Sequence, residues 1–113
     1  MQKLGRGMLI SGAECTGVLR VVETVQDVIA LMKTDVSNVI LFTRSASATT
    51  VTPLFSRIKG VVCTAGGPTS HLAIVAREFD IPCVMASEIY YDGNLDLQNI
   101  LINKEGEIFL APA

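Results

Sequence analysis

The chain has 113 residues, half of them hydrophobic and 18% charged, with a formal net charge of -2 and a pI near 5.2. This is the size and composition of one globular domain over residues 1–113, and not of a disordered chain. The acidic balance argues against nucleic acid as a partner, and no apolar run approaches the roughly 18–20 residues that a membrane span needs.

Residues 1–7 lack the apolar core of a signal peptide, which predicts a cytoplasmic protein. The three cysteines are widely separated and odd in number, a pattern typical of reduced, buried thiols in the cytoplasm. A metal site built from Cys63, His71 and Cys83 would have a ligand spacing unlike that of familiar zinc motifs. We therefore expect no metal ion in this domain.

Glycines punctuate the first 17 residues of the chain and predict tight turns and close backbone approaches there. Residues 17–22 are rich in β-branched side chains and predict a strand. Thr24 then predicts the N-cap of a helix over residues 25–33. The apolar side chains of this helix fall on one face, which we expect to pack on the core, and they are Val25, Val28, Ile29 and Met32.

The other elements follow from short apolar runs and the breakers between them. Strands are expected at 38–42, 60–63, 83–85, 99–102 and 107–110, the last two joined by a hairpin turn. Short helices are expected from Pro53 to about Ile58, and between the Gly66-Gly67 loop and Ile81-Pro82. Strands alternating with helices, and a hairpin at the end, predict the α/β class.

Residues 43–52 are rich in Ser and Thr and show no clear periodicity. They fit a solvated loop whose hydroxyl groups cap the neighbouring backbone. They fit equally a phosphate-facing loop in which Arg44 is the one cation. The sequence leaves both interpretations open.

The only histidine of the chain, His71, lies where a glycine-rich loop gives way to an apolar helix. Gly66 and Gly67 let the backbone approach a ligand closely, and Thr69 or Ser70 would be the helix N-cap. Free N–H groups and the helix dipole favour an anion at that point and disfavour a protonated imidazole. A neutral, nucleophilic imidazole beside an anion site suits attack on a phosphoryl group, giving a phosphohistidine.

The stretch Gly66-Gly67-Pro68-Thr69-Ser70-His71-Leu72-Ala73-Ile74-Val75-Ala76-Arg77-Glu78, followed by Ile81-Pro82, resembles the phosphohistidine signature of the phosphoenolpyruvate-utilising enzymes. That family includes phosphoenolpyruvate synthase, pyruvate phosphate dikinase, enzyme I of the sugar phosphotransferase system and rifampicin phosphotransferase. The resemblance extends to residues 39–62 and, more loosely, to Ser11-Gly12 and Gly17, so it covers nearly the whole chain. It departs at Ser47-Ala48-Thr49, where the family usually has Thr-x-Pro, and at Met85-Ala86-Ser87, which lacks the glycine that the family often carries.

The resemblance implies a mobile, swivelling β/β/α domain whose mixed sheets pack with about three short helices. It implies that His71 is phosphorylated on Nε2, and that Gly66, Gly67 and Ser70 surround the phosphoryl group. Thr69 matches a threonine that some dikinases and synthases use for regulatory phosphorylation.

In the family, such a domain takes a phosphoryl group at one partner site and delivers it at a second. The resemblance therefore implies an ATP-grasp-like domain and a phosphoenolpyruvate-binding barrel as partners, with Mg²⁺ and ATP or phosphoenolpyruvate bound there. A (β/α)₈ barrel alone needs about 250 residues, so it is not within this chain. We expect this domain itself to bind no cofactor.

Two alternatives remain from the sequence. The chain could be a catalytically degenerate relative that acts as a regulatory or interaction module. It could also bind a small anion through the same loop without any covalent step. Pyruvate, a phenol, an antibiotic and a carrier protein all stay open as the phosphoryl acceptor.

Overall fold

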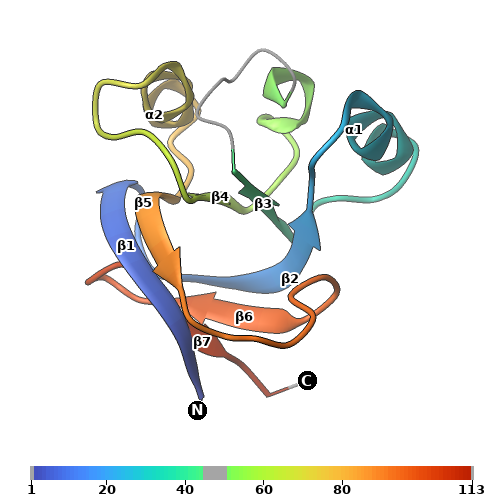
Figure 1. The fold of residues 1–113 in the computed structure, drawn as a ribbon. Helices are drawn as coiled ribbons and strands as arrows, with labels where there is room; N and C mark the ends of the chain where they lie inside the picture. Colours follow the sequence, from blue (N-terminus) through green and yellow to red (C-terminus); the bar gives the residue numbers. More distant parts are fainter. Residues whose placement is uncertain (1, 45–50, 113) are drawn as a thin grey trace.

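Seven strands close into a barrel with the order β1-β5-β4-β3-β2-β6-β7, in which β1 pairs with both β5 and β7 (Figure 1). The structure is a computed structural model that describes residues 2–44 and 51–112. The strands are β1 (Lys3–Ser11), β2 (Cys15–Val21), β3 (Val39–Thr43), β4 (Gly60–Cys63), β5 (Cys83–Ile89), β6 (Asn99–Ile102) and β7 (Glu107–Leu110).

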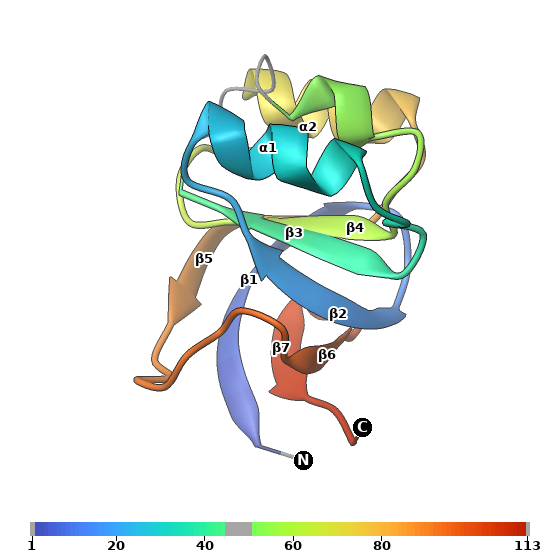
Figure 2. The same cartoon turned by 90° about the vertical axis from the view of Figure 1, so that its right-hand side faces the viewer.

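One part of the barrel is parallel and the other antiparallel. Strands β2, β3, β4 and β5 are parallel neighbours, whereas β6, β7 and β1 pair antiparallel. Parallel neighbours need crossover connections. These contain helix α1 (Val25–Met32), the 3₁₀ helix η1 (Thr52–Leu54) and helix α2 (His71–Glu78). The helices lie together on one side of the barrel, and the chain termini lie at the opposite side (Figures 1 and 2).

Two clusters of buried apolar side chains hold these layers together. One fills the barrel and includes Ile40, Phe42 and Val62, and the other lies under the helices and includes Leu41 and Leu72. Successive side chains of β3 thus pack alternately into the two clusters, and all five residues of this strand are buried. Every residue of β4 is buried as well, so both faces of these two parallel strands are covered.

The expected fold class is wrong. The described residues form a single closed barrel with two α-helices, in place of mixed sheets in a swivelling β/β/α domain with three helices. The third expected helix, from Pro53 to about Ile58, is reduced to the single 3₁₀ turn of η1. Few residues separate Pro53 from the start of β4, so an α-helix there would gain few hydrogen bonds for the cost of nucleation.

Lys3–Ser11 form the nine-residue strand β1, where turns were expected, whereas Gly12, with a φ of +76°, lies in the short connection between β1 and β2. A Cβ atom on Gly5 would lie 2.3 Å from the Glu88 carbonyl oxygen, and one on Gly7 would lie 2.6 Å from Val84 Cγ1. The expected close backbone approach is therefore confirmed. Glycine here lets β1 pack against β5, and this pairing helps to close the barrel.

Helix α1 begins as expected, with Thr24 as N-cap and Asp27 completing a capping box. The expected packing face is wrong for three of its four residues. Val28 is buried, but Val25, Ile29 and Met32 are 56%, 46% and 45% exposed. No described helix is long and apolar enough to cross a membrane.

Candidate functional site

Helix α2 begins directly at His71, where the sequence predicts the reactive residue. Ser70 is the N-cap, and its Oγ accepts a hydrogen bond from the Ala73 amide at 3.3 Å. The Ser70 carbonyl accepts from the Ile74 amide at 3.0 Å, which starts the helical ladder. The expected N-cap is thereby confirmed as Ser70, and His71 becomes the first helical residue. Its imidazole thus lies at the positive end of the helix dipole.

The loop before α2 is closed onto the helix by hydrogen bonds. The hydroxyl and the amide of Ser70 both donate to the Gly67 carbonyl, at 2.8 and 3.1 Å. From the other end of α2, Arg77 Nη1 donates to the Pro68 carbonyl at 2.8 Å. Sequence reasoning assigned no role to Arg77, although the Ala-Arg pair of the signature could have drawn attention to it.

The structure gives a reason for glycine at position 66 but not at position 67. Gly66 has a φ of +76°, a left-handed conformation that favours glycine. Gly67 has no positive φ, and a Cβ atom built on it would meet no heavy atom within 4 Å. Neither backbone conformation nor packing within the described residues requires glycine at position 67. Its missing side chain leaves open space beside the helix start.

The side chains of His71 and Thr69 are exposed, and Ser70 is half-buried. Within residues 2–44 and 51–112 the His71 imidazole forms no hydrogen bond or ion pair. It is therefore accessible to a group from outside the chain. The expected roles of these residues stay predictions.

Arg44 lies at the end of β3 and forms an ion pair with Glu23, with Nη1 2.8 Å from Oε1. Its guanidinium carbon is also 5.3 Å from the centroid of the Phe42 ring. An open hollow of about 510 Å³ is lined by Val22, Glu23, Thr43 and Arg44. A phosphate-facing role for Arg44 would have to compete with Glu23 and stays a prediction. Residues 45–50 of the Ser/Thr-rich loop, including Ser47-Ala48-Thr49, lie outside the described residues.

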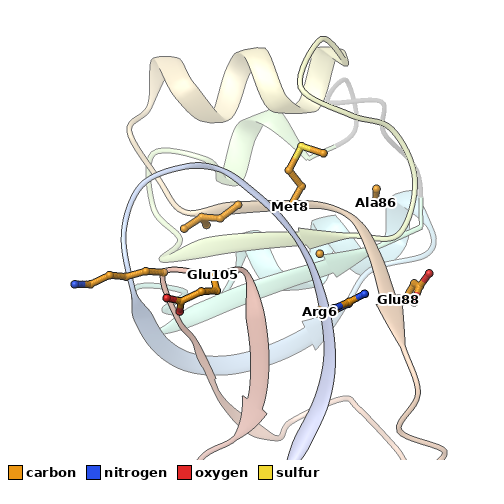
Figure 3. Close-up of a pocket in the computed structure, with 8 residues that line it drawn as sticks. Arg6, Met8, Ala86, Glu88 and Glu105 are labelled. Atoms are coloured by element: carbon orange, nitrogen blue, oxygen red, sulfur yellow. The ribbon is translucent and has the colours of Figure 1, made fainter.

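A second open hollow, of about 580 Å³, lies over β1 and β5 beside the β6–β7 turn (Figure 3). It is lined by Arg6, Gly7, Met8, Leu9, Ala86, Glu88, Lys104 and Glu105. His71 is not among these residues, and the charged side chains include two basic and two acidic ones. Although this hollow is larger than the one beside Arg44, it is not the better candidate for a phosphoryl-transfer site, because no histidine or cysteine nucleophile lines it.

The three cysteines of the chain are free thiols, and none of them forms a disulfide. Cys63 and Cys83 are buried beneath the helices. Burial raises the pKa of the Cys83 thiol to about 12 and that of Cys15 to about 11. Within residues 2–44 and 51–112, no group of three or more His, Cys, Asp or Glu side chains is placed to hold a metal ion.

A family described as "PEP-utilising enzyme, mobile domain" matches residues 35–105, which include the glycine loop and the whole of α2. The chain belongs to this family. Among curated relatives, rifampicin phosphotransferase of Bacillus subtilis is 32% identical over 82 residues, which cover 73% of this chain and 9% of that protein. The chondramide synthase of Chondromyces crocatus is 45% identical over 38 residues, which cover 34% of this chain and 1% of the synthase. The mobile domain therefore spans a small part of the length of these relatives.

Solved structures share the fold of the mobile domain at low sequence identity. A chain of aconitase X from Thermococcus kodakaraensis aligns with a TM-score of 0.67 and 14% identity, covering 99% of this chain and 100% of that one. The microcin C7 self-immunity protein aligns with a TM-score of 0.57 and 13% identity, covering 94% of this chain and 41% of that one. At such identities the likeness concerns the fold alone.

Proposed function

We propose that this mobile domain carries a phosphoryl group on His71. The observation that carries the proposal is the position of this residue, which is the only histidine of the chain. It is exposed as the first residue of α2, and Gly67, which precedes it in the loop, has open space where a side chain would be. Membership of the family and the similarity to a phosphotransferase support the same role.

In the proposed reaction the Nε2 lone pair of neutral His71 forms a P–N bond to the phosphoryl group of the donor. The P–O bond to the donor breaks, and that oxygen leaves with the bonding electrons. At a second site an acceptor oxygen attacks phosphorus, and the imidazole leaves. The amides at the start of α2 hold the negative charge of the phosphoryl group in this proposal, and the loop of Gly66, Gly67 and Ser70 surrounds it.

The donor and acceptor sites belong to partner domains or subunits in this proposal. ATP or phosphoenolpyruvate, with Mg²⁺, would bind to an ATP-grasp-like domain and a phosphoenolpyruvate-binding barrel. The large remainder of the phosphotransferase relative leaves space for such domains. We place the reaction in the cytoplasm, with phosphorylation of Thr69 as its regulation.

Intact-mass measurement tests the carrier role. The chain is incubated with its partner domains, Mg²⁺, and either ATP or phosphoenolpyruvate. We expect a gain of about 80 Da, which is lost in acid and stable in alkali, as a phosphoramidate bond requires. His71→Ala should show no gain, because it removes the nucleophile.

A labelled His71→Ala variant, or an adduct that survives acid, would contradict the proposal. Reversible protection of the loop by inorganic phosphate, with no adduct under any condition, would instead identify a non-covalent anion site. An unreactive His71 without phosphate binding would identify a degenerate interaction module.

A further inference from the structure

We propose that Arg77 is a positioning residue for His71. Its hydrogen bond to the Pro68 carbonyl holds the loop that leads into the helix start at His71. This inference rests on the proposed function, and it assigns a task to a side chain that would not touch the phosphoryl group. Arg77 is exposed and lies in the last turn of α2, six residues after His71.

The side chain of Arg77 extends backwards along its own helix. Six residues of α-helix correspond to a rise of about 9 Å, and helical side chains tilt towards the N-terminus. The long stem of arginine spans this separation and places Nη1 2.8 Å from the Pro68 carbonyl oxygen. A cation in the last turn would ordinarily remain near the helix C-terminus, where the dipole favours it. Here the guanidinium bonds to the loop at the opposite end.

The bond of Arg77 fixes a part of the loop that Ser70 does not reach. Ser70 ties the Gly67 carbonyl, whereas Arg77 ties the carbonyl of the next residue, Pro68. Together they attach two consecutive peptide groups of the loop to α2. The imidazole of His71 has no hydrogen bond of its own within the described ranges, so its placement depends on the loop and the helix start.

Arg57 provides a matched control elsewhere in the fold. It is also exposed, and its guanidinium likewise donates to backbone carbonyls, those of Met32 and Thr34 at 3.1 and 2.7 Å. These carbonyls lie at the end of α1. Arg57→Met therefore removes a positive charge and hydrogen bonds to backbone carbonyls at a place that does not contact the loop before His71. Arg77→Met removes the same charge together with the hydrogen bond to Pro68 that we assign to positioning.

The test uses hydrogen exchange and the lifetime of a chemical adduct. Exchange is measured at the amides of Ser70 and Ala73, whose hydrogen bonds report closure of the loop. Potassium phosphoramidate supplies the phosphoryl group in the absence of partners. The imidazole forms the P–N bond, the P–N bond of the reagent breaks, and ammonia leaves. We expect Arg77→Met to accelerate exchange at both amides by about fivefold, equivalent to about 1 kcal/mol.

The phosphorylated imidazole should also hydrolyse faster in Arg77→Met than in the wild type, because a loose loop no longer aligns the helix-start amides with the phosphoryl group. In Arg57→Met we expect both quantities at their wild-type values. Wild-type exchange in Arg77→Met, or faster exchange with an unchanged adduct lifetime, would overturn the positioning role. Absence of an adduct on the wild-type chain would overturn the carrier function itself, an outcome that is distinct because it does not involve the variants.

Discussion

A Cβ atom built on Gly7 of β1 would lie 2.9 Å from the Cα atom of Ser87 in β5. The two strands therefore cross at backbone distance. At the same place the Ser87 hydroxyl is buried and donates to the Cys63 carbonyl of β4 at 2.8 Å. Strands β1, β5 and β4 therefore meet at this point of the barrel wall. The lack of a side chain on Gly7 lets β1 approach β5, and the buried hydrogen bond of Ser87 links β5 to β4.

A β-bulge accompanies this crossing. Arg6 pairs with Glu88 and Met8 pairs with Met85, so β5 contains one residue more than β1 between these pairs. Within the bulge Ala86 has a φ of +51°. A left-handed conformation costs a residue with a Cβ atom about 1–2 kcal/mol.

Replacing Ala86 by Gly should therefore stabilise the fold. The relief of strain exceeds the larger conformational entropy that glycine brings to the unfolded chain, which costs about 0.5–1 kcal/mol. We expect the free energy of unfolding to rise by about 0.5–1 kcal/mol, measured as a higher urea midpoint at unchanged slope. Gly7→Ala is the opposing control and should destabilise, because its Cβ atom meets Val84 and the backbone of β5. A lower midpoint for Ala86→Gly would contradict the argument.

The glycine loop gives a second prediction, in which one substitution lowers stability and another lowers the rate of phosphorylation. Gly66→Ala should lose about 1–2 kcal/mol, because its φ of +76° disfavours a side chain. Gly67→Ala should change stability by less than about 0.5 kcal/mol, because its Cβ atom enters open space. It should nevertheless slow phosphorylation of His71, since the methyl group fills that space. Urea unfolding measures the stability of both variants, and intact-mass time courses measure the rate of phosphorylation. Equal losses of stability in the two variants, or a wild-type rate of phosphorylation in Gly67→Ala, would contradict this prediction.

These glycines illustrate what sequence reasoning could reach. It located the loop, the N-cap and His71, because a cap and a glycine pair are local signals. The barrel depends on β1 pairing with β5 and β7, which are distant in the chain, and the glycines of β1 locally indicate turns. The absence of a glycine at Met85-Ala86-Ser87 was visible, but its consequence was not, because the φ of Ala86 depends on the register of two strands.

Helix α1 provides a third prediction, which separates neighbouring apolar residues. The helical spacing assigns Val28 and Ile29 to one packing face, whereas the barrel buries only the first and leaves the second 46% exposed. Val28→Ala should cost about 1–3 kcal/mol through lost burial and a cavity. Ile29→Gln should change stability by less than about 0.5 kcal/mol. Chemical denaturation of both variants measures these changes. A comparable loss of unfolding free energy in the two variants would show that Ile29 packs in the core.

Acid should weaken the start of α1, because the pKa of Asp27 lies below its ordinary value of 3.8. The amide of Glu23 donates to Asp27 Oδ2 at 2.8 Å and lowers the pKa most, followed by the amide of Thr24 at 3.0 Å. A lowered pKa in the folded state means that the carboxylate stabilises the fold above its unfolded pKa and loses this effect as pH falls through the folded pKa. We therefore expect the wild type to exceed Asp27→Asn in unfolding free energy at pH 7, and the difference to be lost as the pH falls below 3.8 and through the lowered pKa of the folded state. Other carboxyls such as Glu107 titrate in both proteins and cancel in the comparison, so a difference that persists unchanged into acid would show that the charge of Asp27 contributes nothing.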